Sequence, residues 1–380
     1  MKTPRWWSRM RRTLGLRNME RYEVQEKLGS GGFATVYLAR DVVTDKEVAL
    51  KISVDANRDY IGMLKREVKF MEMLNHENVV SIIEHFTPED GDRYVQAIVM
   101  PLMTGSLDGY IKDNAPVPFD EVKTLANQVS DGLAHMHEHG IVHGDIKPDN
   151  ILIRDGTYII ADFGSAFTPA DSLASTYGHC ALYASPEIVL ENWEIVGSAA
   201  DVWSLGCVIF EALTGLMLFD AEEATDEETD YEGETDTESA EAPETDETPE
   251  CSDDACSTGA EAGSDESLDP IARTNVIGCF SDETYDDDEH HAQVVVHMFE
   301  MIRVLGPMPE FFWRRNRSVI GKDGRVLPGL AEDYALSGAS TTLEEEIDRN
   351  DVTPAFMVVL KAMFAFLPRH RLRASSVAFG

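Results

Sequence analysis

One short stretch of the sequence constrains this chain more than any other. Residues 143–150 are His-Gly-Asp-Ile-Lys-Pro-Asp-Asn, and residues 162–164, a short distance further on, are Asp-Phe-Gly. The two segments supply acids, a lysine and an asparagine at the spacing needed to hold a nucleotide, a metal ion and a hydroxyl group. In that chemistry the protein contributes charge that positions phosphate and Mg²⁺, plus a carboxylate that receives a proton. The pattern therefore predicts phosphoryl transfer.

The residue types in these two segments indicate separate roles. We predict that Asp145 is the catalytic carboxylate and that Lys147 balances the charge of the transferred phosphate. Asn150 and Asp162 are predicted to bind Mg²⁺, which prefers carboxylate and carbonyl oxygens. The predicted cofactors are therefore ATP and Mg²⁺.

Upstream motifs complete the predicted nucleotide site. Residues 28–36, Leu-Gly-Ser-Gly-Gly-Phe-Ala-Thr-Val, are typical of a hairpin loop whose glycines let backbone amides approach phosphates. The next apolar strand carries Lys51, which is predicted to bind the α and β phosphates, and a following helix carries Glu67, which would hold Lys51 in place. Glu72 is an alternative partner for Lys51. We prefer Glu67, because its distance to the segment 75–80 matches the pattern of the eukaryotic protein kinase family, which these motifs resemble.

Taken in this order, the motifs resemble the eukaryotic protein kinase family over about residues 20–375. The resemblance implies an α+β fold of two lobes, a small β-rich lobe at 20–103 and a larger, mainly helical lobe at 104–380. It also implies that Met103 offers a hydrogen-bond donor to adenine. The implied nucleotide-binding residues are Leu28, Gly29, Gly31, Val36, Ala49, Lys51, Glu67, Met103, Leu152 and Asp162.

Three further positions match structural residues of this family. The segment 185–187, Ser-Pro-Glu, stands where the family has Ala-Pro-Glu, and Asp201 opens the expected central helix of the large lobe. The resemblance implies that Glu187 pairs with Arg371 and that Asp201 hydrogen-bonds the backbone of the catalytic loop. Both roles are structural.

The resemblance implies a serine/threonine protein kinase that transfers the γ-phosphate of ATP to hydroxyl groups of proteins. A pseudokinase scaffold that binds nucleotide or partner proteins is the alternative, because Cys180 stands where such kinases usually have a threonine that hydrogen-bonds the catalytic residues. The end of the chain at Gly380, where the family normally has one more helix, leaves the same alternative open. A small-molecule kinase is a second rival, which the segment 185–187 disfavours.

Two details bear on subgroup and regulation. Residues 294–312, which include Leu-Gly-Pro-Met-Pro, weakly resemble the group of cyclin-dependent, MAP and SR-protein kinases, but Ala184 replaces the arginine of that group. Gly144 replaces the arginine that kinases activated by loop phosphorylation commonly have before the catalytic aspartate. We therefore predict that activity does not require a phosphate in the loop 165–185.

The negative charge of the chain is concentrated in one segment. The formal net charge is -37, and residues 221–290 contain 27 Asp and Glu against one Arg, which leaves -11 for the rest of the chain. We interpret 221–290 as an acidic insert in the kinase domain, and its part 221–268 has too few apolar residues to offset chain entropy. A tolerated, solvated insertion is the simpler interpretation, and recruitment of basic substrates or occupation of the cleft is the alternative.

The remaining expectations concern partners and location. Residues 1–19 form a basic arm, compatible with an interfacial helix or a targeting peptide but more typical of an arm that stays loose or folds onto its own domain. We expect a monomer that acts on protein substrates, with basic substrates favoured if Asp149 contacts them, and we expect no nucleic-acid or membrane partner. Five cysteines without zinc-type pairing fit a reducing cytoplasm or nucleus.

Overall fold

The computed structural model describes residues 19–30, 34–55, 58–87, 94–169, 181–219, 287–333, 336 and 340–379. The predicted basic arm, apart from Met19, and nearly all of the predicted acidic insert lie outside these residues, as do Gly31, Cys180 and most of the loop 165–185. The positions 287–290 at the end of the predicted insert belong to a helix.

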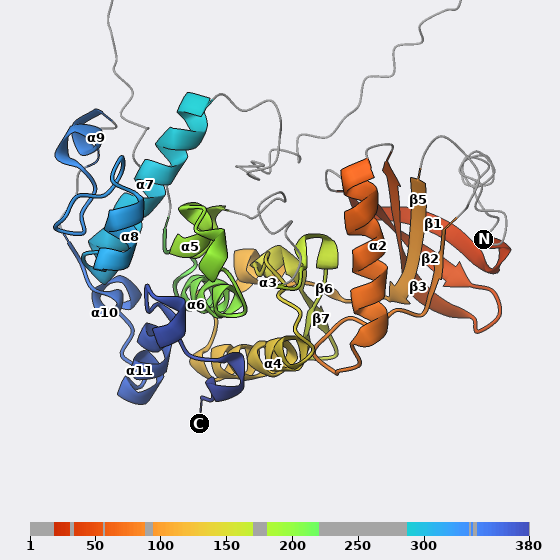
Figure 1. The fold of residues 1–380 in the computed structure, drawn as a ribbon. Helices are drawn as coiled ribbons and strands as arrows, with labels where there is room; N and C mark the ends of the chain where they lie inside the picture. The colour runs from red at the N-terminus through yellow and green to blue at the C-terminus, as the bar shows by residue number, and fades with distance from the viewer. Residues whose placement is uncertain are drawn as a thin grey trace, which may run out of the picture. The chain divides into compact units, whose positions relative to one another are not determined.

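An antiparallel five-stranded sheet forms the first part of the described chain (Figure 1). Its spatial order is β1-β2-β3-β5-β4, and helix α2 (Arg58–Met73) lies along it. The strands are β1 (Tyr22–Ser30), β2 (Ala34–Asp41), β3 (Lys46–Asp55), β4 (Glu84–Phe86) and β5 (Tyr94–Pro101).

Strand β3 shows how side-chain alternation separates the two faces of this sheet. Val48, Leu50 and Ile52 are buried in an apolar cluster on one face, together with residues of β1, β2 and β5. Ala49 belongs instead to the main core of the protein. Because successive side chains of a strand point to opposite faces, Lys51 shares the face of Ala49. The strand thus directs Lys51 away from the smaller cluster.

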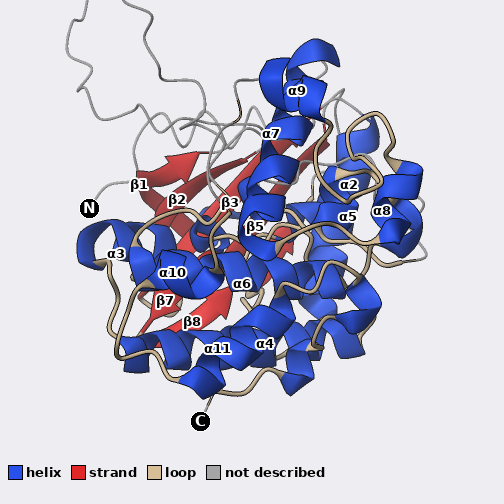
Figure 2. Cartoon of the chain, turned by 90° about the vertical axis from the view of Figure 1, so that its left-hand side faces the viewer, coloured by secondary structure: helices blue, strands red, loops and turns tan. Residues whose placement is uncertain are grey.

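The rest of the described chain is mainly helical (Figure 2). A short antiparallel sheet of order β6-β7-β8 lies within it. Its strands are β6 (Gly105–Ser106), β7 (Ile151–Arg154) and β8 (Thr157–Ile160). The helices are α3 (Leu107–Asn114), α4 (Phe119–Glu138), α5 (Pro186–Val189), α6 (Ala199–Thr214), α7 (Asp287–Leu305), α8 (Glu310–Arg315), α9 (Pro328–Asp333), α10 (Leu343–Ile347) and α11 (Pro354–Met363). No helix among the described residues is long and apolar enough to cross a membrane.

Helix α6 is buried around most of its circumference, and α4, α10 and α11 all contact it. A helix that is apolar on all sides forms the interior of a large core rather than its surface. Trp203, fully buried on α6, stacks against Phe219 with ring centroids 5.7 Å apart and meets Phe364 edge-on at 5.2 Å. Gly206 lies beside the same ring, since a Cβ atom there would come within 2.8 Å of Phe364.

A buried ion pair joins two distant parts of the sequence behind this helix. Arg371 donates to both carboxylate oxygens of Glu187, at 2.7 and 3.0 Å, and neither side chain is exposed. The Arg371 guanidinium also donates to the carbonyls of Ala199, Ala365 and Phe366. The pairing implied by the sequence resemblance is therefore present, with the remaining guanidinium donors directed at backbone carbonyls.

Replacing Arg371 by Ala should lower the free energy of unfolding by roughly 3–5 kcal/mol, because the Glu187 carboxylate would remain buried without its cation. Urea denaturation followed by tryptophan fluorescence measures the change. Arg40→Ala, which removes the exposed pair of Arg40 with Asp45, serves as the matched control and should have little effect. Equal stabilities of the Arg371 variant and the wild type would contradict the expectation.

Candidate active site

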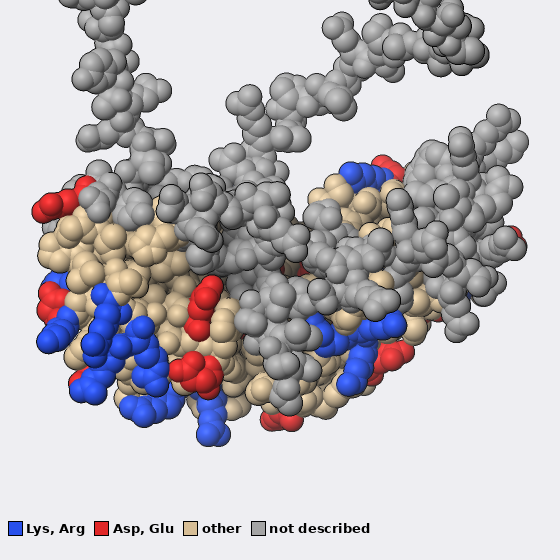
Figure 3. Space-filling view, turned by 45° about the horizontal axis from the view of Figure 1, so that its top comes forward, with Lys and Arg blue, Asp and Glu red and all other residues tan. Residues whose placement is uncertain are grey.

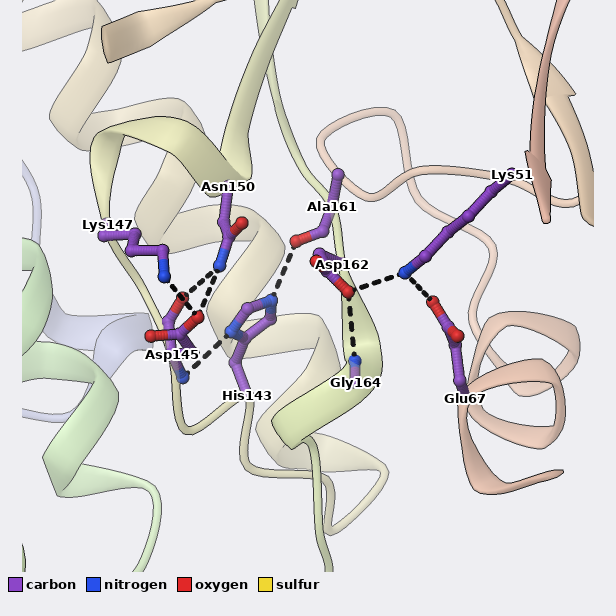
Figure 4. Close-up of polar contacts among 9 residues, drawn as sticks. All are labelled: Lys51, Glu67, His143, Asp145, Lys147, Asn150, Ala161, Asp162 and Gly164. Atoms are coloured by element: carbon purple, nitrogen blue, oxygen red, sulfur yellow. Dashed lines mark hydrogen bonds and ion pairs between the residues drawn. The ribbon is translucent and has the colours of Figure 1, made fainter. Parts of the chain in front are cut away.

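The loop between α4 and β7 brings three of the predicted catalytic residues together (Figure 4). The Asp145 carboxylate oxygen Oδ2 lies 2.9 Å from Lys147 Nζ and accepts a 2.8 Å hydrogen bond from Asn150 Nδ2. The same Asn150 amide donates to the Asp145 backbone carbonyl at 2.8 Å. Asp145 is thus held at side chain and backbone by residues of its own loop.

A second group connects the five-stranded sheet, α2 and the segment after β8. Lys51 Nζ donates to Glu67 Oε1 at 2.7 Å and to Asp162 Oδ1 at 2.8 Å. Lys51 is 12% exposed and Glu67 only 2%, whereas Asp162 is 51% exposed. Glu67, rather than Glu72, is therefore the partner of Lys51, and Asp162 is the member of the group that faces solvent.

The charges of Lys51 and Asp162 keep each other ionised, whereas burial raises the pKa of Glu67 despite the charge of Lys51. Burial by itself lowers the pKa of Lys51, but the carboxylates of Asp162 and Glu67 outweigh it and hold that pKa above its usual value. The Lys51 charge is also the main reason why the pKa of Asp162 is lowered to about 2. Lys51 and Asp162 therefore remain charged throughout the neutral range of pH, as their predicted roles in binding phosphate and metal require.

Asp201 anchors the catalytic loop from helix α6. Its two carboxylate oxygens accept the backbone N–H groups of His143 and Gly144, each at 2.9 Å. His137 lies 2.8 Å from Oδ2, and its hydrogen bond and charge hold the pKa of the buried Asp201 below its usual value despite burial. Gly144 has φ +78°, a left-handed conformation that glycine adopts without strain.

His143 is a site residue to which sequence reasoning assigned no role. Its ring is fully buried, and Nε2 lies 3.1 Å from the carbonyl oxygen of Ala161, which can only accept. Nε2 therefore carries the proton, and Nδ1 accepts the Asp145 backbone N–H at 3.3 Å. His143 thereby joins the loop of Asp145 to the strand end before Asp162. The one sequence feature that pointed to His143 is its position directly before Gly144 and Asp145.

The backbone of Asp162 is in the left-handed region, with φ +65° and ψ +85°. Such a conformation is strained for a residue other than glycine and requires support from its surroundings. The support comes from the hydrogen bond of Gly164 N to Asp162 Oδ1, at 3.3 Å, and from Phe163, whose ring is fully buried and lies 5.6 Å from that of His143.

The side chains of Asn150 and Asp162 fit a magnesium ion by their chemistry. Among the described residues, the side-chain hydrogen bonds of Asn150 are made by Nδ2 and those of Asp162 by Oδ1, which leaves Asn150 Oδ1 and Asp162 Oδ2 for a metal ion. Among the described residues no group of three or more His, Cys, Asp or Glu could hold a metal ion by itself. Phosphate oxygens and water would complete the shell, as is usual for Mg²⁺.

Of the residues predicted to contact the adenine, four belong to or pack against the main core, and Leu28 is exposed. Ala49 belongs to the main core, and Val36, Met103 and Leu152 are partly buried against the same cluster. Leu28 is 48% exposed on β1, and the neighbouring Gly29 has open space where a Cβ atom would be. Gly31 lies outside the described residues.

With this geometry in place, comparison with known proteins defines the class. Residues 22–272 match the protein kinase domain family, and the chain belongs to that family. It is 37% identical over 220 residues to the serine/threonine-protein kinase PrkC of Bacillus subtilis, an alignment covering 56% of this chain and 33% of that protein. It is 32% identical over 216 residues to mouse mitogen-activated protein kinase 12, covering 54% and 57% of the two chains. The chain thus spans between a third and three fifths of the lengths of these relatives.

A solved structure shows the same fold. The crystal structure of a kinase domain superposes on this chain with a TM-score of 0.63 at 17% sequence identity. The superposition covers 94% of this chain and 93% of the other chain. The α+β protein kinase fold predicted from the sequence is therefore confirmed, and the family implies ATP binding.

Replacing Lys51 by Ala should weaken ATP binding by about tenfold or more, because the phosphates lose a charge-assisted hydrogen bond and face Asp162 without its counterion. Titration with a fluorescent ATP analogue in the presence of Mg²⁺ measures the affinity. Lys27→Ala on the exposed part of β1 removes the same charge and should bind the nucleotide like the wild type. Unchanged affinity of the Lys51 variant would show that this lysine does not contact phosphate.

Proposed function

We propose that this protein is a serine/threonine protein kinase that transfers the γ-phosphate of ATP to hydroxyl groups of proteins, with Asp145 as catalytic base. The supporting observation is the arrangement in Figure 4, where Asp145 is positioned by Lys147 and Asn150 while Lys51 is positioned by Glu67 and Asp162. One group suits a hydroxyl substrate and the other suits a polyphosphate. His143 holds the two in fixed relation through Asp145 and Ala161.

In this proposal each residue acts through charge and position. The Asp145 carboxylate accepts the proton of the attacking hydroxyl, and its contacts with Lys147 and Asn150 fix the direction in which it does so. Lys147 offsets negative charge on the transferred phosphoryl group, and Lys51 offsets that of the α and β phosphates. Asn150 and Asp162 would hold Mg²⁺, which would supply positive charge against the phosphate oxygens. Positioning and electrostatics are the main contributions a protein makes to this reaction.

A second element of the proposal is a preference for basic substrates. Asp149 of the catalytic loop, Asp108 of α3 and Glu211 of α6 interact electrostatically, with Lys112 as the nearby cation. Burial raises the pKa of Glu211 to about 7, a 2.6 Å hydrogen bond from the Tyr183 hydroxyl opposes the rise, and the charges of Asp108 and Asp149 add to it. The pKa of Asp149 is raised as well, by burial and by Asp108. An arginine of a substrate would relieve this mutual repulsion.

Replacing Asp145 by Asn should lower kcat by at least about a hundredfold, because an amide cannot accept the hydroxyl proton. Transfer of labelled phosphate from ATP to a mixed Ser/Thr peptide array in the presence of Mg²⁺ measures it. Nucleotide affinity should change little, which separates loss of the base from loss of the fold.

The contrary outcome of this assay is informative as well. A folded wild type that binds ATP and transfers no phosphate to any peptide would refute the proposed activity and favour the scaffold alternative. Transfer by the Asp145→Asn variant at the wild-type rate would refute the role of Asp145 alone.

The preference for basic substrates predicts a pH dependence with a definite sign. Because the pKa of Glu211 is raised to about 7, this carboxyl is mostly neutral at about pH 6 and ionised at about pH 8. The ratio of kcat/KM for a peptide with arginine before the target serine to that for its glutamine counterpart should therefore rise over this interval. Glu211→Gln should flatten the rise. A ratio that stays constant with pH in the wild type would contradict the assignment of Glu211.

A further inference from the structure

Five exposed cations lie close together in the sequence on α8 and the loop after it. They are Arg314, Arg315, Arg317, Lys322 and Arg325. Within residues 314–325 only Asp323 is acidic, so this segment carries a formal charge of +4 in a chain whose net charge is -37. Figure 3 shows Lys and Arg side chains gathered at the left-hand end of the molecule, the end that carries α8 in Figure 1. We call these five residues the basic patch.

The loop that carries most of the basic patch is rigidly built. Asn316 caps the end of α8 by donating from both its backbone N–H and its side-chain amide to the Phe312 carbonyl, each at 3.0 Å. Leu327 N donates to the Val319 carbonyl at 2.9 Å, and Met308 N donates to the Gly324 carbonyl at 2.8 Å. Gly324 has φ +76°, and a Cβ atom there would come within 2.3 Å of the Met308 carbonyl oxygen.

Apolar side chains of the same segment pack into the main core and anchor the loop. Phe312, Val319, Ile320 and Val326 are all buried in the main core. The cations are therefore presented at fixed positions rather than on a flexible tail. A surface with fixed charges loses less conformational entropy when it binds a partner.

Two of the five cations already have anionic or aromatic partners. Arg314 pairs with Glu310 on the same helix, and Arg315 pairs with Glu194 at 3.1 Å while its guanidinium lies 3.9 Å from the centre of the Phe311 ring. Arg317, Lys322 and Arg325 form no ion pair with any residue that the structure describes. Asp323 is occupied locally, since its Oδ1 accepts the Arg325 backbone N–H at 3.2 Å.

We propose that the basic patch is a docking surface for an acidic polypeptide segment of a partner protein. Arg317, Lys322 and Arg325, which have no ion pair among the described residues, supply the complementary charge, and the hydrogen-bonded loop supplies the fixed geometry. A short acidic peptide fits a patch of this size better than nucleic acid does. Duplex DNA carries about one charge per 1.7 Å and would extend beyond the patch toward the rest of a chain whose net charge is -37.

The test is binding of a fluorescein-labelled peptide rich in Asp and Glu to the full chain, followed by fluorescence anisotropy at low and at physiological salt. The combined variant Arg317→Ser, Lys322→Ser and Arg325→Ser should bind roughly fivefold or more weakly than the wild type and should lose most of its salt dependence. The combined variant Lys46→Ser, Lys69→Ser and Arg369→Ser makes the same change of net charge at exposed positions elsewhere and should bind like the wild type.

Circular dichroism and ATP binding establish that each variant is folded, and Lys322→Glu on the exposed turn provides an independent substitution with the least effect on the loop. Equal weakening in the two combined variants would overturn the proposal, because it would reduce the effect to net charge. Tighter binding of a short DNA duplex than of the acidic peptide, lost in the patch variant, would also overturn it in favour of nucleic acid. Neither readout depends on phosphoryl transfer, so failure here leaves the proposed kinase activity untouched.

Discussion

The active site depends on one buried carboxylate, that of Asp201. The catalytic loop has little regular secondary structure, so most of its backbone N–H groups have no partner in a helix or sheet. Asp201 accepts two of them, from His143 and Gly144, at the position where the chain enters the left-handed conformation of Gly144. Because Asp201 belongs to α6, a helix buried around most of its circumference, the position of Asp145 is fixed by the packing of the core.

The same use of buried charge recurs near the start of α6, the part of the helix that also carries Asp201. Arg371 joins Glu187 to backbone carbonyls at the start of α6 and near the end of α11, and its guanidinium lies 5.0 Å from the centre of the Trp203 ring. A buried ion pair contributes little net stability compared with apolar residues. Removing one of its two partners is costly, because the other charge remains buried without compensation. Asp201 and Glu187 therefore act as geometric constraints: each allows only one arrangement of the segments it joins.

Sequence reasoning succeeded where chemistry and local periodicity determine the outcome. The resemblance to the kinase family indicated the pair of Lys51 and Glu67, which the structure shows. Strand alternation explains why Lys51 faces away from the smaller cluster. Sequence reasoning gave no role to His143, because that role depends on a contact with Ala161, which is distant in the sequence. The sequence did not predict the interaction of Glu211 with Asp149 for the same reason. Glu211 occurs in an apolar helical pattern 62 positions after Asp149. Such contacts arise only when separate elements pack together.

The composition of the chain did not reveal the basic patch, because the net charge of -37 is the sum of a small positive segment and a much larger negative one. Electrostatic interactions between exposed charges are screened within about 8 Å at physiological salt. A partner at the surface therefore responds to the charges directly beneath it more than to the net charge of the chain. Around Asp149 and Glu211 those charges are acidic, and on α8 and its following loop they are basic. A protein substrate that satisfied both proposed surfaces would need cationic residues next to its target hydroxyl and an acidic segment elsewhere, which is a more selective requirement than either charge alone.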